Sequence, residues 1–103
     1  MLDRTIGDRR GEAIDLGNLG NVNLALGKFH EAIAFYQQRL ALAREFGEAH
    51  GEAGALFNLS VAFAKLNDLA QAIPHAEAAL KIYEQIEASN AVKVRELLQK
   101  WRQ

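Results

Sequence analysis

Cysteine is absent from this chain of 103 residues. Without thiols the chain can form neither a disulfide scaffold nor a thiolate-bound metal site, and this suits a reducing compartment. An excess of charge of one sign is also lacking, since 12 Lys and Arg face 13 Asp and Glu for a net charge of −1. The overall charge therefore predicts no attraction to nucleic acid or to an anionic membrane.

Long hydrophobic runs are missing as well. No apolar stretch approaches the roughly 20 residues that a membrane-spanning helix needs. The first residues, MLDRTIGDRRGEA, lack the apolar core of a secretory signal. We therefore expect a soluble, cytoplasmic protein with neither a membrane nor a nucleic-acid partner.

Residue patterns typical of catalysis and metal binding are also lacking. His30, His50 and His75 are far apart in the sequence, and none has another metal-ligand residue type four positions away on a helix. No Gly-Lys-Ser/Thr sequence follows the glycines, and Ser60 does not lie in a nucleophile motif. The sequence predicts a protein that is not an enzyme and that carries no cofactor and no metal.

An internal repeat dominates what is present. Residues 7–46 align without a gap on residues 47–86, a period of forty positions. The identical positions, given by their first-copy numbers, are Gly7, Gly11, Glu12, Ala13, Leu16, Asn18, Leu19, Leu26, Ala32, Ile33 and Leu40. A fixed period of this size indicates stacked supersecondary units, each of which buries its apolar face only against its neighbours.

Each repeat reads as two helices. Apolar spacing predicts helices over residues 9–25, 29–45, 48–66, 69–86 and 91–102. Asp8 and Ser89-Asn90 are the expected caps of the first and last helices, and Asp68 with Gln71 forms a capping-box pattern. Gly27, Gly47 and Asn67 are expected to end helices in the left-handed conformation. Pro74 lies inside the fourth helix and should bend it without ending it.

The two ends of the chain read differently from the repeats. Leu2 and Ile6 match the apolar positions that close each repeat, so residues 1–6 are either a ragged start or the remnant of a preceding repeat's second helix. We favour the remnant, which makes Leu2 and Ile6 the expected contacts of a homo-oligomer. The domain plan is then repeat one at residues 7–46, repeat two at residues 47–86 and a capping helix at residues 87–103, with Trp101 packed on repeat two.

The repeated residues resemble the tetratricopeptide repeat family, whose pattern reads Trp-x-x-Leu-Gly-x-x-Tyr, then Ala-x-x-x-Phe, then Pro. The matching residues are Leu16, Leu19, Gly20, Ala32 and Tyr36 in repeat one and Leu56, Leu59, Ser60, Phe63 and Ala72 in repeat two. The resemblance implies an all-α, right-handed α-solenoid of antiparallel helix pairs. Small residues such as Gly20 should allow the paired helices to approach closely.

Several positions depart from that pattern. Asn23 occupies the Tyr position, Arg39 a position usually held by Ala, and Ala76 the aromatic position, while the closing Pro is missing from both repeats. The period of forty exceeds the family's usual 34. In this it resembles the arrays of kinesin light chains, polarity scaffolds and bacterial regulators.

The resemblance places a concave groove along the first helix of each pair. The candidate groove residues are Asn18, Asn21, Phe57, Asn58, Val61 and Lys65. A carboxamide offers both a donor and an acceptor to a peptide backbone, although Asn18 and Asn58 could instead bond to the neighbouring repeat. Phe57 is either an apolar anchor for the partner or covered by the C-terminal helix.

Two functions remain open from the sequence. The first is a scaffold that binds a peptide or partner protein, as a fragment of a longer array in a regulatory or signalling protein. The alternative is a self-association module.

Overall fold

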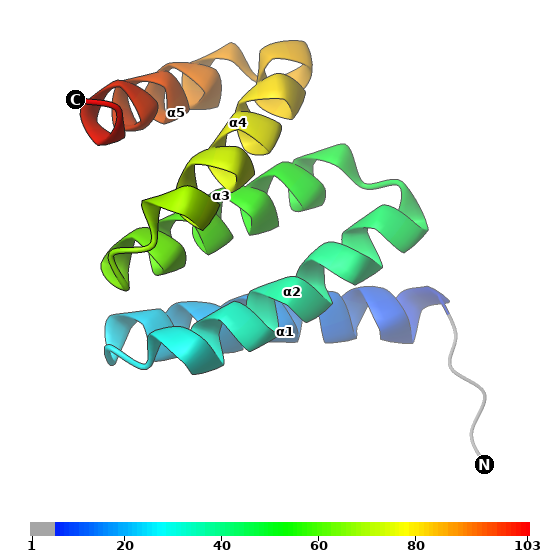
Figure 1. The fold of residues 1–103 in the computed structure, drawn as a ribbon. Helices are drawn as coiled ribbons and strands as arrows, with labels where there is room; N and C mark the ends of the chain where they lie inside the picture. The colour runs from blue at the N-terminus through cyan, green and yellow to red at the C-terminus, as the bar shows by residue number, and fades with distance from the viewer. Residues whose placement is uncertain (1–5) are drawn as a thin grey trace.

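The computed structural model describes the backbone of residues 6–103 and the side chains from Asp8 onward. It contains five helices, α1 (Ile6–Ala25), α2 (Phe29–Phe46), α3 (Ala49–Lys65), α4 (Leu69–Ile86) and α5 (Ala88–Trp101), and no strand within this part of the chain. Figure 1 shows each helix packing on the next in a zigzag, so that the molecule is elongated, at 52 × 31 × 18 Å. The all-α fold expected from the repeat is confirmed.

The three residues expected to end helices in the left-handed conformation do so. Gly27, Gly47 and Asn67 have φ of 77°, 64° and 61°. The capping box at α4 is half formed: Asp68 Oδ1 accepts from the Gln71 backbone N–H at 3.2 Å. The Gln71 side chain, however, donates to the Asp68 carboxylate and not to its backbone. Pro74 lies within α4, which continues past it to Ile86.

Two helix starts differ from the expectation. α1 begins at Ile6, so Asp8 lies in its first turn, where a carboxylate favours the helix dipole, and does not cap it. Ile6 lies within α1 as the structure describes it, while Leu2 lies outside the described residues, so the remnant of a preceding repeat stays a prediction. α5 begins at Ala88, because the single extended residue Glu87 (φ −158°, ψ 93°) is enough to redirect the chain. Ser89-Asn90 thus lies inside α5 and does not cap it.

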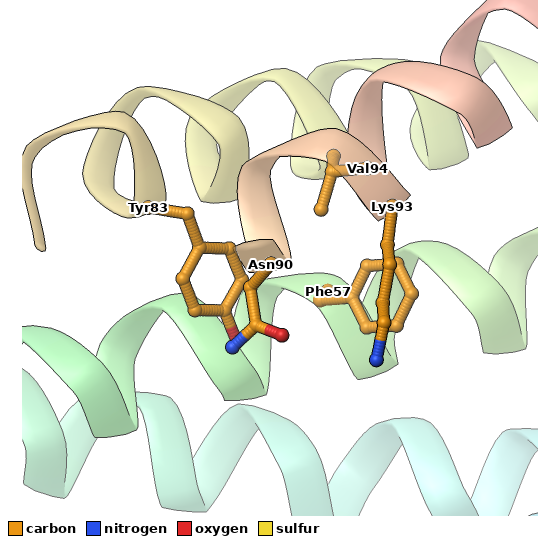
Figure 2. Close-up of a pocket in the computed structure, with 5 residues that line it drawn as sticks. All are labelled: Phe57, Tyr83, Asn90, Lys93 and Val94. Carbon is orange, nitrogen blue, oxygen red and sulfur yellow. The ribbon is translucent and has the colours of Figure 1, made fainter. Parts of the chain in front are cut away.

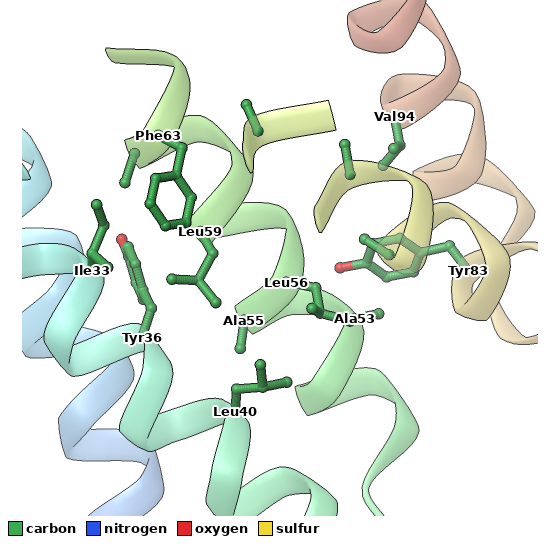
Figure 3. Close-up of a cluster of buried hydrophobic side chains, with 14 of the residues drawn as sticks. Ile33, Tyr36, Leu40, Ala53, Ala55, Leu56, Leu59, Phe63, Tyr83 and Val94 are labelled. Carbon is green, nitrogen blue, oxygen red and sulfur yellow. The ribbon is translucent and has the colours of Figure 1, made fainter. Parts of the chain in front are cut away.

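The hydrophobic core lies along α3, which packs against α2 on one side and α4 on the other. Leu59 of α3 and Tyr36 of α2 are fully buried within it (Figure 3). The outer side of α4 is covered by α5 through Val94 and Leu98, both 1% exposed, and Trp101 packs against the same core. The expected cover of repeat two by the last helix is therefore present.

Close packing of the first helix pair depends on one glycine. A Cβ atom at Gly20 would lie 2.5 Å from Cε1 of Tyr36, well inside van der Waals contact. Repeat two carries Ser60 where repeat one has Gly20, and Ala76 where repeat one has Tyr36. The larger residue at the first position is thus accompanied by a smaller one at the second. The predicted close approach at Gly20 is confirmed.

We expect Gly20→Ala to lower the free energy of unfolding by about 1–3 kcal/mol, because the added methyl displaces a buried ring. Gly11→Ala is the matched control, since nothing lies within 4 Å of a Cβ atom there. It should raise stability by about 0.5–1 kcal/mol through helix propensity alone. Urea denaturation followed by circular dichroism measures both variants. Equal stability of the two would contradict the packing argument.

Candidate functional site

Phe57 of α3 faces the N-terminal half of α5. It lines a cavity of about 40 Å³ together with Tyr83, Asn90, Lys93 and Val94 (Figure 2). Phe57 is partly buried, so α5 shields the ring without closing it off from solvent. Cover by the C-terminal helix, one of the two interpretations from the sequence, is thus present in part, while a role of Phe57 as an anchor for a partner stays a prediction.

Val61 and Lys65 line a larger open cavity further along α3. Its volume is about 320 Å³, and α5 supplies Leu97, Lys100 and Trp101 to its wall. We name the surface formed by these two cavities the α3–α5 groove. Its residues are Phe57, Val61, Ala64 and Lys65 of α3, Tyr83 of α4, and Asn90, Lys93, Val94, Leu97, Lys100 and Trp101 of α5.

Asn90 lines the smaller of these cavities, whereas Asn58, next to Phe57 on α3, lines neither. Among the described residues, neither Asn58 nor Asn90 makes a side-chain hydrogen bond. Neither is among the buried polar groups that lack a partner, so both carboxamides reach solvent. The alternative in which Asn58 bonds to the neighbouring repeat is not observed in this part of the chain.

The two candidate asparagines of α1 lie elsewhere. Asn18 lines a shallow depression of about 390 Å³ with Asp15, Leu19 and Val22, all of α1. Asn21 accepts a hydrogen bond of 2.6 Å from the Tyr36 hydroxyl, so its carbonyl oxygen already supports a core side chain. Of the sequence candidates, only Phe57, Val61 and Lys65 therefore line the α3–α5 groove.

Tyr83 presents its hydroxyl to the groove although its ring is buried. The oxygen lies 3.7 Å from where a Cβ atom of Gly54 would be. No hydrogen bond to it is present within the described chain, and it is not occluded from solvent. Burial and, second, the negative charge of Glu87 raise the pKa of Tyr83, so the hydroxyl stays a donor at neutral pH.

Arg39 of α2 was not predicted from the sequence as a site residue, yet it reaches α3. Its stem passes Gly17 of α1, 3.8 Å from where a Cβ atom would be, and its guanidinium covers Gly51 of α3. A Cβ atom at Gly51 would lie 2.6 Å from Nη2 of Arg39. The sequence did carry one signal for this contact. A cation stands at a position that alanine usually holds in the repeat pattern, and glycines lie on both neighbouring helices.

Residues 12–85 match the family model described as Tetratricopeptide repeat. The chain belongs to the tetratricopeptide repeat family. This match covers most of the chain and most of both copies of the internal repeat. Comparison with curated proteins gives no match. Tetratricopeptide repeats form a non-enzymatic scaffold fold and generally mediate protein–protein interactions.

The outer face of α1 is exposed, whereas the matching face of α3 in the second repeat is buried. Leu19 and Val22 of α1 are 45% and 55% exposed, whereas their equivalents in α3 are completely buried against α2. Leu26, one turn further, is 64% exposed. We name Leu19, Val22 and Leu26 the α1 edge.

Two further properties concern the whole described chain. No helix between residues 6 and 103 is long and apolar enough to cross a membrane. Within the same residues, no group of three or more His, Cys, Asp or Glu side chains is arranged to hold a metal ion.

Proposed function

We propose that this tetratricopeptide domain binds a peptide segment of a partner protein in the α3–α5 groove. The observation that carries the proposal is the mixture of side chains along this surface. Partly exposed apolar residues such as Phe57, Val61 and Trp101 stand beside donors and acceptors that have no partner within the described chain. Apolar side chains of a peptide would enter the cavities while Asn58 and Asn90 bond to its backbone.

Panning of a random-peptide phage library against the immobilised full chain provides the probe, and fluorescence anisotropy of a selected peptide gives its affinity. Asn58→Ala should weaken binding by about 1–3 kcal/mol, or roughly five- to a hundredfold, because it removes one buried hydrogen-bond pair. The melting temperature should stay unchanged, since Asn58 makes no hydrogen bond in the described structure. Asn18→Ala is the matched control, as Asn18 lies outside the groove.

Failure to enrich any peptide would contradict the proposal. A lower melting temperature of the Asn58 variant with unchanged binding would instead assign this side chain to the stacking of the repeats.

The second candidate function is self-association, and the α1 edge favours it. Its leucines and valine lie three and four residues apart, so they form one apolar stripe over two turns. The opposite end of the molecule is closed by α5, where Arg95 and Arg102 pair with Glu84 and Glu77. Among the described residues of α4 and α5 near that end, Ile86 and Val92 are the strongly exposed large apolar side chains, fewer than on the α1 edge. The copy that covers the α1 edge is therefore expected to use its own α1 edge across a two-fold axis. Leu2 and Ile6, proposed from the sequence, would extend this contact.

Sedimentation equilibrium over a concentration series tests this second candidate. The wild-type chain should approach the dimer mass, and Val22→Lys should return it to a monomer by placing a charge in the contact. Val92→Lys on α5 is the matched control, because Val92 is similarly exposed, at 47%, but lies at the other end of the molecule. A monomer at every concentration would rule out the contact.

A further inference from the structure

Arg39 differs from the other arginines whose side chains the structure describes. Each of the others pairs with a glutamate, as in Arg9–Glu45 at 2.8 Å and Arg44–Glu52 at 3.1 Å. The remaining pairs are Arg10–Glu48, Arg95–Glu84 and Arg102–Glu77. Arg39 alone among them has no carboxylate partner in the described chain, yet it is partly buried and its nitrogens are not occluded from solvent.

The Arg39 guanidinium lies against the backbone of α3. It fills the space over Gly51, and Gly54 follows on the next turn of α3, about 5–6 Å away. At Gly54 the nearest atom to a Cβ position is the Tyr83 hydroxyl at 3.7 Å, so a bound segment can approach the helix closely there, beside the guanidinium. We name Gly51 and Gly54 the glycine strip.

Further donors border the other side of the strip. The Tyr83 hydroxyl faces Gly54, and Asn90 and Lys93 share a cavity with Tyr83 (Figure 2). Lys93 has no ion-pair partner within the part of the chain described here.

The acids near the strip are already engaged. Glu48 pairs with Arg10, Glu52 with Arg44, and Glu87 with His50 at 2.9 Å. The strip therefore offers several hydrogen-bond donors and no free acid among these glutamates. This is an arrangement complementary to an anion.

We propose that the glycine strip receives an acidic side chain of the peptide bound in the α3–α5 groove, with Arg39 as its principal partner. This inference rests on the proposed function and adds the chemistry of the ligand. An arginine guanidinium pairs with a carboxylate through two parallel hydrogen bonds, a geometry that a lysine does not reproduce. The Tyr83 hydroxyl and Lys93 would supply further donors from the other side.

The test uses peptides selected by phage panning on the full wild-type chain. These should be enriched in Asp or Glu at one position, and replacing that residue by Asn or Gln should weaken binding by about tenfold or more. On the Arg39→Gln variant the same replacement should change affinity less than about twofold, as in a double-mutant cycle. Arg39→Lys should keep only part of the preference.

Arg95→Gln is the matched control, because Arg95 pairs with Glu84, which is not one of the three acids named near the strip. It should leave the preference for the acid unchanged. Melting temperatures of all variants separate loss of binding from loss of fold.

The outcomes distinguish the two proposals. Peptides that bind in the groove without an acidic position, or whose preference survives Arg39→Gln, would overturn the inference and leave the proposed function standing. If panning selects no peptide, both proposals fail. Selection of phosphopeptides alone from a phosphorylated library would replace the carboxylate by a phosphate and so also overturn it.

Discussion

Leu59→Ala should lower the free energy of unfolding by about 2–5 kcal/mol, because it opens a cavity in the most enclosed part of the core. Leu59 is 0% exposed and lies on the central helix α3, which packs against both α2 and α4. Because these two helices lie on different sides of α3, they cannot both move to fill the cavity. A small domain has a total stability of only about 5–15 kcal/mol. We expect much of this variant to be unfolded at 37 °C, and thermal and urea denaturation would measure this.

The matched control is Leu19→Ala, at the same position of the other repeat. Leu19 is 45% exposed, so its truncation should cost less than about 1 kcal/mol in the monomer. The two leucines have the same place in the repeat and differ only in whether a neighbouring helix covers them. Equal losses at both positions would contradict the view that contacts between stacked units supply the stability.

Leu98→Asp should separate α5 from the rest of the molecule. Leu98 is 1% exposed against α4, and an unpaired carboxylate there would cost at least about 4 kcal/mol. The core side of α4 around Tyr83 would then become accessible. We expect loss of part of the helical circular dichroism signal, binding of a hydrophobic dye and aggregation.

Val92→Asp provides the control for this substitution. Val92 is 47% exposed on the same helix, so the same carboxylate should change stability by no more than about 0.5 kcal/mol there. A Leu98→Asp variant that melts like wild type would show that α5 contributes little to the fold.

The sequence was sufficient for the arrangement of the helices because the repeat presents each signal twice. Gly27, Gly47 and Asn67 mark helix ends by a local backbone requirement, the left-handed conformation, which residue type alone indicates. The apolar period likewise predicted α2 and α4 within one residue of their observed bounds. Such signals depend only on neighbouring residues.

Features that depend on tertiary contacts were less accessible. Ser89-Asn90 is a good cap by residue type, yet the turn at Glu87 lets α5 begin earlier. Asn21 was a groove candidate in the sequence, but the Tyr36 hydroxyl engages it, and the position that matches Tyr36 in repeat two holds Ala76. For Asn21 the deciding partner lies 15 residues away in the sequence.

The surface proposed to bind a peptide was predicted only in part. Phe57, Val61 and Lys65 were correctly placed on one face of α3, because helical spacing fixes which residues share a face. The contribution of α5 to the same surface depends on the angle at which it packs on α4, which the sequence does not specify. Arg39 was missed because a side chain from a second helix was not expected to reach past Gly17 to Gly51.

The most direct measurement is a set of ¹H–¹⁵N correlation spectra of the full chain during titration with a peptide selected by panning. Binding in the α3–α5 groove predicts that the largest shifts lie at Gly51, Gly54, Phe57 and Val61 on α3 and at Asn90 and Lys93 on α5. The α1 edge, represented by Leu19, Val22 and Leu26, should shift little. Shifts concentrated on α1, or spread evenly over the molecule, would contradict the proposed site.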